Sequence, residues 1–279
     1  MDWITVYKLP IGDGAKAVVD WLTDNAAWFF DGLAAMLEAM IGALLLVLQA
    51  PHPLIVVAAI TAIAYVWHRS IGLTAFVFAG LLLIINQGYW EETTETLALV
   101  LASSVVCMGL GVPVGIAAAR RPWLFTMLRP LLDLMQTIPT FVYLIPALIL
   151  FGLGMVPGLI ATVIFAVPAP IRLTHLGISS TPKALLEAGD AFGATRWQRL
   201  WKVELPYALP QIMAGLTQTI MLSLSMVVIA ALVGADGLGV PTLRALNQVN
   251  IAKGFEVGVA IVLIAIILDR LFRTNERTG

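Results

Sequence analysis

The feature that most constrains this chain is a series of apolar runs, several of them long enough to cross a lipid bilayer. A spanning helix needs about 20 mostly apolar residues, and it satisfies every backbone polar group within itself. The second and third runs are short for this purpose, and the first contains Glu38. We therefore expect an all-α integral membrane protein with seven or eight spans. The candidate spans are residues 34–50, 54–67, 71–85, 94–119, 131–153, 156–176, 207–233 and 257–271.

Composition supports the same class. The chain is 60% hydrophobic and 12% charged, whereas an average soluble domain is about 45–50% apolar and about 25% charged. This share of charged residues is too small to cover a soluble surface of this size. Lipid must therefore solvate much of the chain. The net charge of -1 gives no indication of nucleic-acid binding. The single cysteine, Cys107, lies in an apolar run and is interpreted as a packing residue.

Residues 1–33 differ from the rest. Residues 1–10 contain Asp2 and Lys8 but no basic stretch followed by an apolar one, so we expect no cleaved signal peptide. Residues 18–30 mix Val, Leu, Trp and Phe with Asp20 and Asp24. This pattern predicts an amphipathic helix. Two placements remain open: the helix lies on the membrane, or it packs against the rest of the subunit.

Lysine and arginine placement predicts the orientation, because cytoplasmic loops are enriched in these residues. Arg270, Arg273 and Arg277 lie at or past the end of the last span, which predicts a cytoplasmic C-terminus. The N-terminus is then inside for eight spans and outside for seven. Three further loops are predicted to be cytoplasmic, and they contain Arg69; Arg120, Arg121 and Arg129; and Lys183, Arg196, Arg199 and Lys202.

No motif for catalysis or metal binding is present. The sequence has no G-x-x-x-x-G-K-[ST] loop for a nucleotide, no H-E-x-x-H and no C-x-x-C. His52, His68 and His175 lie far apart near predicted span ends and are interpreted as interfacial polar residues. We therefore expect no catalytic residue and no metal site, and active transport would need energy from another chain.

The loop at residues 179–206 carries the mechanism. Thr181 followed by Pro182 predicts a helix start, with a hydroxyl cap and a proline at the first helical position. Gly189 and Gly193 weaken this helix and permit a bend.

A second helix follows in the same loop. Thr195 and Gln198 have the spacing of a capping box. Trp197, Leu200 and Trp201 would share one face, and Leu205–Pro206 would end the helix. The loop is thus predicted to form a compact two-helix knob that can dock on a soluble partner. The alternative is an ordinary connecting loop.

This loop resembles the EAA loop of ABC-importer permeases, whose pattern is E-A-A-x3-G-x9-I-x-L-P. Gly189 replaces the second alanine of that pattern and Val203 replaces the isoleucine. The resemblance implies that the knob is the coupling helix that enters the ATPase subunit. The matching residues, together with Gly189, are the candidate coupling residues: Glu187, Ala188, Gly189, Gly193, Leu205 and Pro206.

Residues 132–154, 208–239 and 267–271 closely resemble the glycine betaine/proline betaine permeases, a ProW-like family that includes choline permeases. The resemblance implies a type I, MetI-like core of five transmembrane helices at residues 91–275, preceded by additional transmembrane helices at 34–90. It further implies a bacterial inner-membrane importer with two permease copies, an ATPase dimer that binds ATP and Mg²⁺, and a substrate-binding protein. This chain would bind no cofactor. Its cargo would be choline, glycine betaine or proline betaine.

Polar residues within spans are costly in lipid and face protein or a water-filled path. Interhelical hydrogen bonding is the alternative for most of them, and Pro139, Pro146, Pro168 and Pro170 are expected to bend their spans. An aromatic cage for a quaternary ammonium is expected on the binding protein. The candidate path residues are Gln136, Thr137, Gln218, Ser223 and Ser225, with Thr219 beside them.

Asp133 and Arg172 lie at similar depth in consecutive, antiparallel spans, and we predict that they form an ion pair. Arg129, four residues before Asp133, is a rival partner.

Two other classes of protein would require features of their own. A self-sufficient secondary transporter would need ionisable residues near mid-span and an internal repeat. A membrane enzyme would need paired acids, a metal cluster or a nucleophile. Neither set of features is evident in the sequence.

Overall fold

The computed structural model describes residues 10–272, which form helices and turns with no strand among them. Asp2, Lys8, Arg273 and Arg277, which entered the predictions above, lie outside the described residues. The helices are α2 (Ile11–Gln49), α3 (Pro53–His68), α4 (Ile71–Asn86), α5 (Trp90–Arg120), α6 (Pro122–Thr137), α7 (Thr140–Phe151), α8 (Met155–Ala166), α9 (Pro168–Ser179), α10 (Lys183–Ala191), α11 (Arg196–Arg199), the π-helical turn η1 (Leu200–Glu204), α12 (Leu205–Ala230), the 3₁₀ turn η2 (Ala231–Val233), α13 (Gly239–Asn247) and α14 (Ile251–Phe272).

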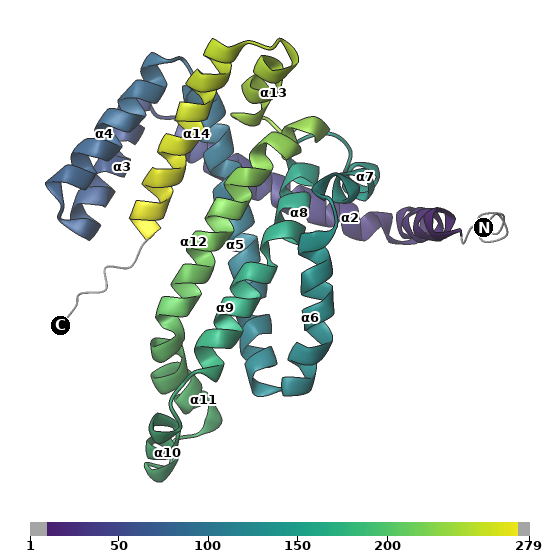
Figure 1. Cartoon of the computed structure of the whole chain (residues 1–279), viewed down its shortest axis with the longest axis vertical. Helices are drawn as coiled ribbons and strands as arrows, with labels where there is room; N and C mark the ends of the chain where they lie inside the picture. Colours follow the sequence, from purple (N-terminus) through teal and green to yellow (C-terminus); the bar gives the residue numbers. More distant parts are fainter. Residues whose placement is uncertain (1–9, 273–279) are drawn as a thin grey trace, which may run out of the picture.

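Helices α5, α9 and α12 form the centre of the bundle, with α8 above α9 and α6 beside it (Figure 1). Glycines allow this close packing. A Cβ built on Gly115 would lie 2.7 Å from the carbonyl oxygen of Ile171. One built on Gly177 would lie 2.9 Å from the Cβ of Ala208. Membrane helices associate largely by such van der Waals contact, since lipid gives no hydrophobic driving force between them.

The predicted span at 131–153 is wrong as a single straight helix. Two helices, α6 and α7, meet there at 94°. The break lies at Ile138 and Pro139, where the backbone is extended, because a residue before proline is disfavoured in the helical region. The Tyr143 hydroxyl donates to the carbonyl oxygens of Leu134 and Met135. The Met135 carbonyl lacks its usual helical donor because Pro139 has no N–H, so this bond satisfies a group that the break exposes.

The predicted amphipathic segment is the first part of α2, a 39-residue helix that also contains the first candidate span. Ala26 departs from helical geometry (φ −123°, ψ 16°) and marks a kink. Val18, Trp21 and Trp28 are exposed, which argues against packing of this part within the subunit. The later part of α2 packs on α5, α7 and α8, and the first part projects beyond the bundle (Figure 1).

Among residues 10–272, five helices are long and apolar enough to span a bilayer, or six if the bent pair α6–α7 counts as one span. Seven or eight spans were expected. The difference comes from α3 and α4, which have 16 residues each and are therefore about 24 Å long. That length is less than the ~30 Å of a typical hydrocarbon core. The two helices lie side by side next to α14, and their role as additional transmembrane helices stays a prediction.

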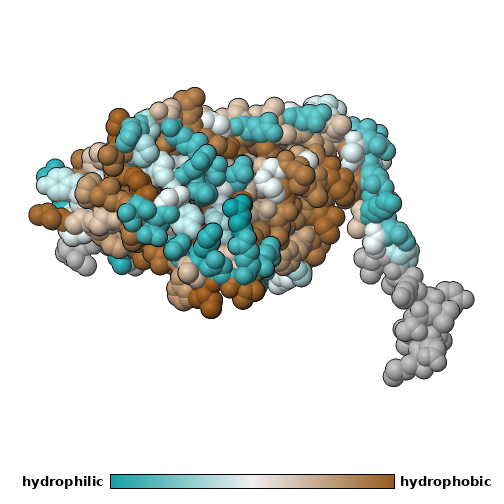
Figure 2. Space-filling view, turned by 90° about the horizontal axis from the view of Figure 1, so that it is seen from above, coloured by the Kyte–Doolittle hydropathy of each residue, from teal (hydrophilic) through white to brown (hydrophobic). Residues whose placement is uncertain are grey.

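The two ends of the bundle differ. The α10–α11 pair forms one end, and α13 lies at the other (Figure 1). Seen from the α13 end, hydrophilic residues cover much of the middle of the face and apolar residues dominate its flanks (Figure 2). This distribution suits a bundle whose sides contact lipid and whose end contacts water.

Candidate coupling site

The knob at residues 179–206 starts differently from the prediction. Helix α10 begins at Lys183, and Pro182 occupies the cap position without a side-chain cap bond. Thr181 was expected to cap it, and that is wrong. Pro182 is extended (ψ 133°), and Thr181 is 6% exposed with its hydroxyl buried and unpartnered among protein atoms.

The elbow of the knob depends on Gly193. Its φ of +72° lies in the left-handed region, which glycine adopts without strain. Beside it, the large apolar side chain of Phe192 is 92% exposed. Glu187 and Ala188 are also exposed on α10, whereas Gly189 is half-buried. Glu187, Ala188 and Gly193, three of the sequence-predicted coupling residues, thus belong to an accessible surface of the knob.

The second helix starts as predicted. The Thr195 hydroxyl accepts from the Gln198 backbone N–H (3.3 Å), and the Gln198 side-chain oxygen accepts from the Thr195 N–H (2.8 Å). These two bonds confirm the capping box.

The end of this helix was predicted wrongly. Leu205–Pro206 does not terminate it: α11 passes through the π turn η1 directly into α12. Pro206 lies in the first turn of α12, and directly before it the Leu205 N–H donates to the Leu200 carbonyl oxygen in the π turn. A proline is tolerated in a first helical turn. Knob and span are therefore one continuous helical path.

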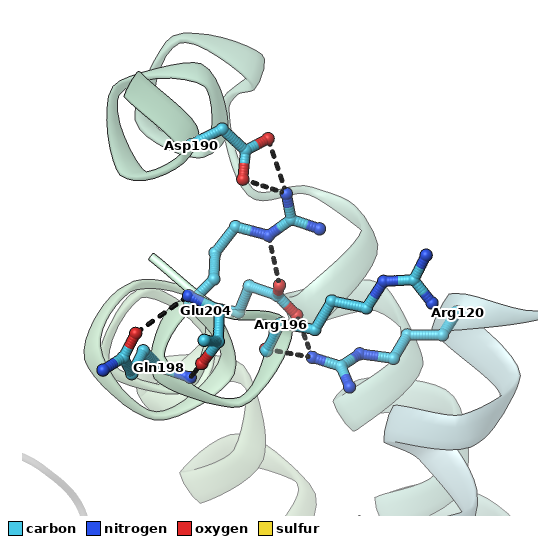
Figure 3. Close-up of polar contacts among 7 residues, drawn as sticks. Arg120, Asp190, Arg196, Gln198 and Glu204 are labelled. Atoms are coloured by element: carbon cyan, nitrogen blue, oxygen red, sulfur yellow. Dashed lines mark hydrogen bonds and ion pairs between the residues drawn. The ribbon is translucent and has the colours of Figure 1, made fainter. Parts of the chain in front are cut away.

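A chain of ion pairs fixes the knob (Figure 3). Arg199 Nη1 lies 2.8 Å from both carboxylate oxygens of Asp190 on α10. Arg199 Nε also donates to Glu204 Oε1 (3.2 Å), and Arg120 Nη2 donates to Glu204 Oε2 (3.3 Å). Arg120 belongs to the end of α5, so the knob is joined to a helix 84 residues away in sequence.

Sequence reasoning missed this network. Arg120, Arg196 and Arg199 served only to predict the orientation in the membrane. Asp190 and Glu204 had no predicted role. The available signal was Glu204 itself, a carboxylate directly before the Leu-Pro of the motif, which is 5% exposed. A charged residue is almost never buried without a partner.

The path candidates fall into two groups. Ser223 is fully buried, and the Ser103 hydroxyl donates to its oxygen at 2.9 Å, a bond between α5 and α12. Thr219 is also buried and donates to the Gly215 carbonyl oxygen of its own helix. Gln218 and Ser225, in contrast, are exposed on one face of α12, seven residues apart. Gln211, another seven residues earlier, is exposed on the same face and was missed, although the spacing of seven marks it.

The remaining candidates meet at the α6–α9 contact. Arg172 Nη2 lies 2.6 Å from Asp133 Oδ1, and Arg172 Nη1 donates to Gln136 Oε1 at 3.2 Å. Within residues 10–272, no ion pair joins Asp133 to the rival Arg129. Thr137 is exposed and its hydroxyl bonds the Leu134 carbonyl oxygen. A role of these residues in a path stays a prediction.

A bundle of membrane helices with a polar knob built into one end defines a class of protein, the translocation subunit of a multi-component transporter. The chain belongs to the family described as binding-protein-dependent transport system inner membrane components, whose sequence model matches residues 111–278. It is therefore a permease subunit of an ABC importer, and ATP hydrolysis belongs to a separate subunit. The family carries with it a location in a membrane and the need for ATPase and substrate-binding partners.

Individual relatives extend the match over nearly the whole chain. The chain is 46% identical over 264 residues to the glycine betaine transport system permease protein OpuAB of Bacillus subtilis, covering 95% of this chain and 93% of that protein. It is 43% identical over 278 residues to the glycine betaine/proline betaine permease protein ProW of Escherichia coli, covering 99% and 73%. An inward-facing structure of the MetNI methionine ABC transporter superposes with a TM-score of 0.60 at 25% identity, covering 66% of this chain and 94% of that one.

Proposed function

We propose that this permease carries quaternary-ammonium compounds, namely choline, glycine betaine or proline betaine, across the bacterial inner membrane. The observation that carries the proposal is the identity to glycine betaine permeases over nearly the whole chain. Uptake of labelled glycine betaine by cells that produce the complete transporter, with the three compounds as competitors, tests it. If none of the three compounds lowers the uptake, the proposed substrate class is refuted.

The energy comes from an ATPase dimer, with ATP and Mg²⁺ bound there, and the knob is the surface that docks into it. Exposed Glu187, Ala188 and Phe192 at the tip support this docking, as does the left-handed turn at Gly193. Gly189 lies on the inner side of α10, where a Cβ would meet the Arg199 side chain at 3.8 Å. Leu205 and Pro206 connect the knob to α12.

A second copy of the permease completes the path. The exposed face of α12 bearing Gln211, Gln218 and Ser225 supports this, because polar side chains at membrane depth face protein or water rather than lipid. A symmetric dimer would place two such faces around one passage.

The knob lies on the cytoplasmic side, as does the C-terminus, and Glu91 and Asp236 lie outside. Single cysteines that replace Glu91, Asp236 or Lys183, in a Cys107→Ala background, can be tested in intact cells with an impermeant labelling reagent. Labelling is expected at 91 and 236 only. Labelling at 183 but not at 91 would reverse the orientation.

Bulky substitutions at the tip test the docking. Ala188→Trp and Gly193→Trp should insert normally yet reduce both uptake and substrate-stimulated ATP hydrolysis, because the added ring blocks the contact. Gly193→Trp adds strain of about 1 kcal/mol at its positive φ, whereas the exposed helical Ala188 adds none. Ala27→Trp on the exposed part of α2 is the matched control. Normal stimulation in a well-folded Ala188→Trp variant would refute the assignment.

A further inference from the structure

Glu204 is a buried carboxylate at the junction of the knob with the spans. Its side chain is 7% exposed, and each of its two oxygens accepts from a different arginine, Arg199 at 3.2 Å and Arg120 at 3.3 Å. It is the last residue of the π turn and is followed directly by α12. The carboxylate therefore touches the knob on one side and the end of α5 on the other (Figure 3).

Each arginine extends the connection. Arg199 clamps α10 through its two contacts with Asp190. Arg120 also donates to the backbone carbonyl oxygen of Arg196 at the start of α11 (3.3 Å). A continuous polar chain thus runs from α10 through α11 and the π turn to both α5 and α12.

This chain resists separation for an electrostatic reason. Removal of one partner from a buried ion pair leaves an uncompensated charge, which costs much more than the loss of an exposed pair. The helical path through η1 joins the knob by its backbone to α12 alone. The ion pairs at Glu204 add a link between the knob and α5 that the backbone of this path does not provide.

We propose that Glu204 is a positioning residue that transmits displacement of the knob to α5 and α12 together. This inference rests on the proposed docking of the knob in the ATPase. With the ion pairs intact, a push on α10 moves both spans as one body. Without them the knob still docks, but its movement reaches α12 through the backbone alone and is no longer passed to α5.

The test is uptake per ATP hydrolysed in proteoliposomes that contain the complete transporter. Glu204→Gln keeps the shape of the side chain and removes its charge. It is expected to bind the ATPase as the wild type does, while uptake per ATP falls about fivefold or more, the lower end of measured couplings between sites. Asp24→Asn, the same chemical change on exposed α2, should leave the ratio unchanged. An unchanged ratio in Glu204→Gln would overturn the inference.

A second variant keeps the test valid if Glu204→Gln fails to fold. The Arg120 side chain is 35% exposed, and Arg120→Gln leaves Glu204 paired with Arg199 while it breaks the connection to α5. It should also lower uptake per ATP, and the double variant should lose no more than Glu204→Gln alone. Additive losses would overturn a shared role. Absence of substrate-stimulated hydrolysis in the wild type would refute the proposed function itself, whereas normal ratios in both variants would refute this inference alone.

Discussion

The central helices and the N-terminal helices are both apolar, yet they are packed in opposite ways. In the most apolar stretch of α8–α9, 72% of the residues are buried, against 11% in α2. The sequence of either region would pass as membrane-spanning. The difference shows that an apolar helix can face either lipid or protein. The positions of its small residues distinguish a lipid-facing helix from a protein-packed one.

The glycines make this distinction concrete. Gly111, Gly115 and Gly215 all lie where a Cβ would come within 3.2 Å or less of an atom of α9. Gly32 and Gly42 on α2 have no such neighbour within 4 Å. Glycine in the centre is thus required by backbone approach, and on α2 it is only tolerated. Three predictions follow the comparison from its largest expected effect to its smallest.

Gly115→Leu should be the most damaging change, because its side chain would collide with Ile171 and Thr174 of α9. Overpacking of this kind costs about 3 kcal/mol or more where the backbone must move. The matched variant Gly42→Leu should stay within about 0.5 kcal/mol of the wild type. Thermal unfolding of the purified protein in detergent measures both, and equal stability of the two variants would break the comparison.

Ser223→Ala should have an intermediate effect. It removes the bond between α5 and α12 and leaves the buried Ser103 hydroxyl with the Val100 carbonyl oxygen of its own helix, at 3.0 Å. Such interhelical bonds in membranes contribute about 0.6 kcal/mol on average. Ser225→Ala, which loses only a bond to Met221 of its own helix, is the control for the same readout. A larger loss for Ser225→Ala would mean that the exposed face of α12 is packed against a partner.

The Asp133–Arg172 pair should contribute least, since the two side chains are 56% and 36% exposed. The median contribution of exposed pairs is about 0–1 kcal/mol, and many contribute nothing measurable. In a double-mutant cycle, Asp133→Asn with Arg172→Gln should lose less than the sum of the single changes. In the cycle that combines Asp133→Asn with Arg129→Gln, the losses of the two single changes should be additive. Strict additivity with Arg172 would exclude an energetic role for the pair.

The sequence predicted most reliably where the signal is local. Thr195 and Gln198 lie three residues apart, and their reciprocal bonds need nothing beyond one helical turn. The Gly193 elbow is local in the same sense, since its left-handed backbone favours glycine. Helical class and the central spans likewise follow from runs of apolar residues.

Prediction failed where the answer depends on distant partners. The Arg120–Glu204 contact joins residues 84 apart, and no spacing rule reaches that far. Thr181 has the chemistry of a cap, but Pro182 takes the cap position with an extended backbone, and the Thr181 hydroxyl is buried away from the helix start. Pro139 indicated a bend in the span. The 94° angle between α6 and α7 depends in addition on the packing of α7 against α8.

The π turn at Leu200–Glu204 sets the rotational phase between the knob and α12. Such a turn holds one residue more than an α-helical turn, and each residue corresponds to about 100° of rotation. A chimera that exchanges the knob between related permeases would therefore have to keep the number of residues between Thr195 and Pro206. Loss of one residue there would turn the tip, with Phe192 and Glu187, about a quarter of a circle away from its partner.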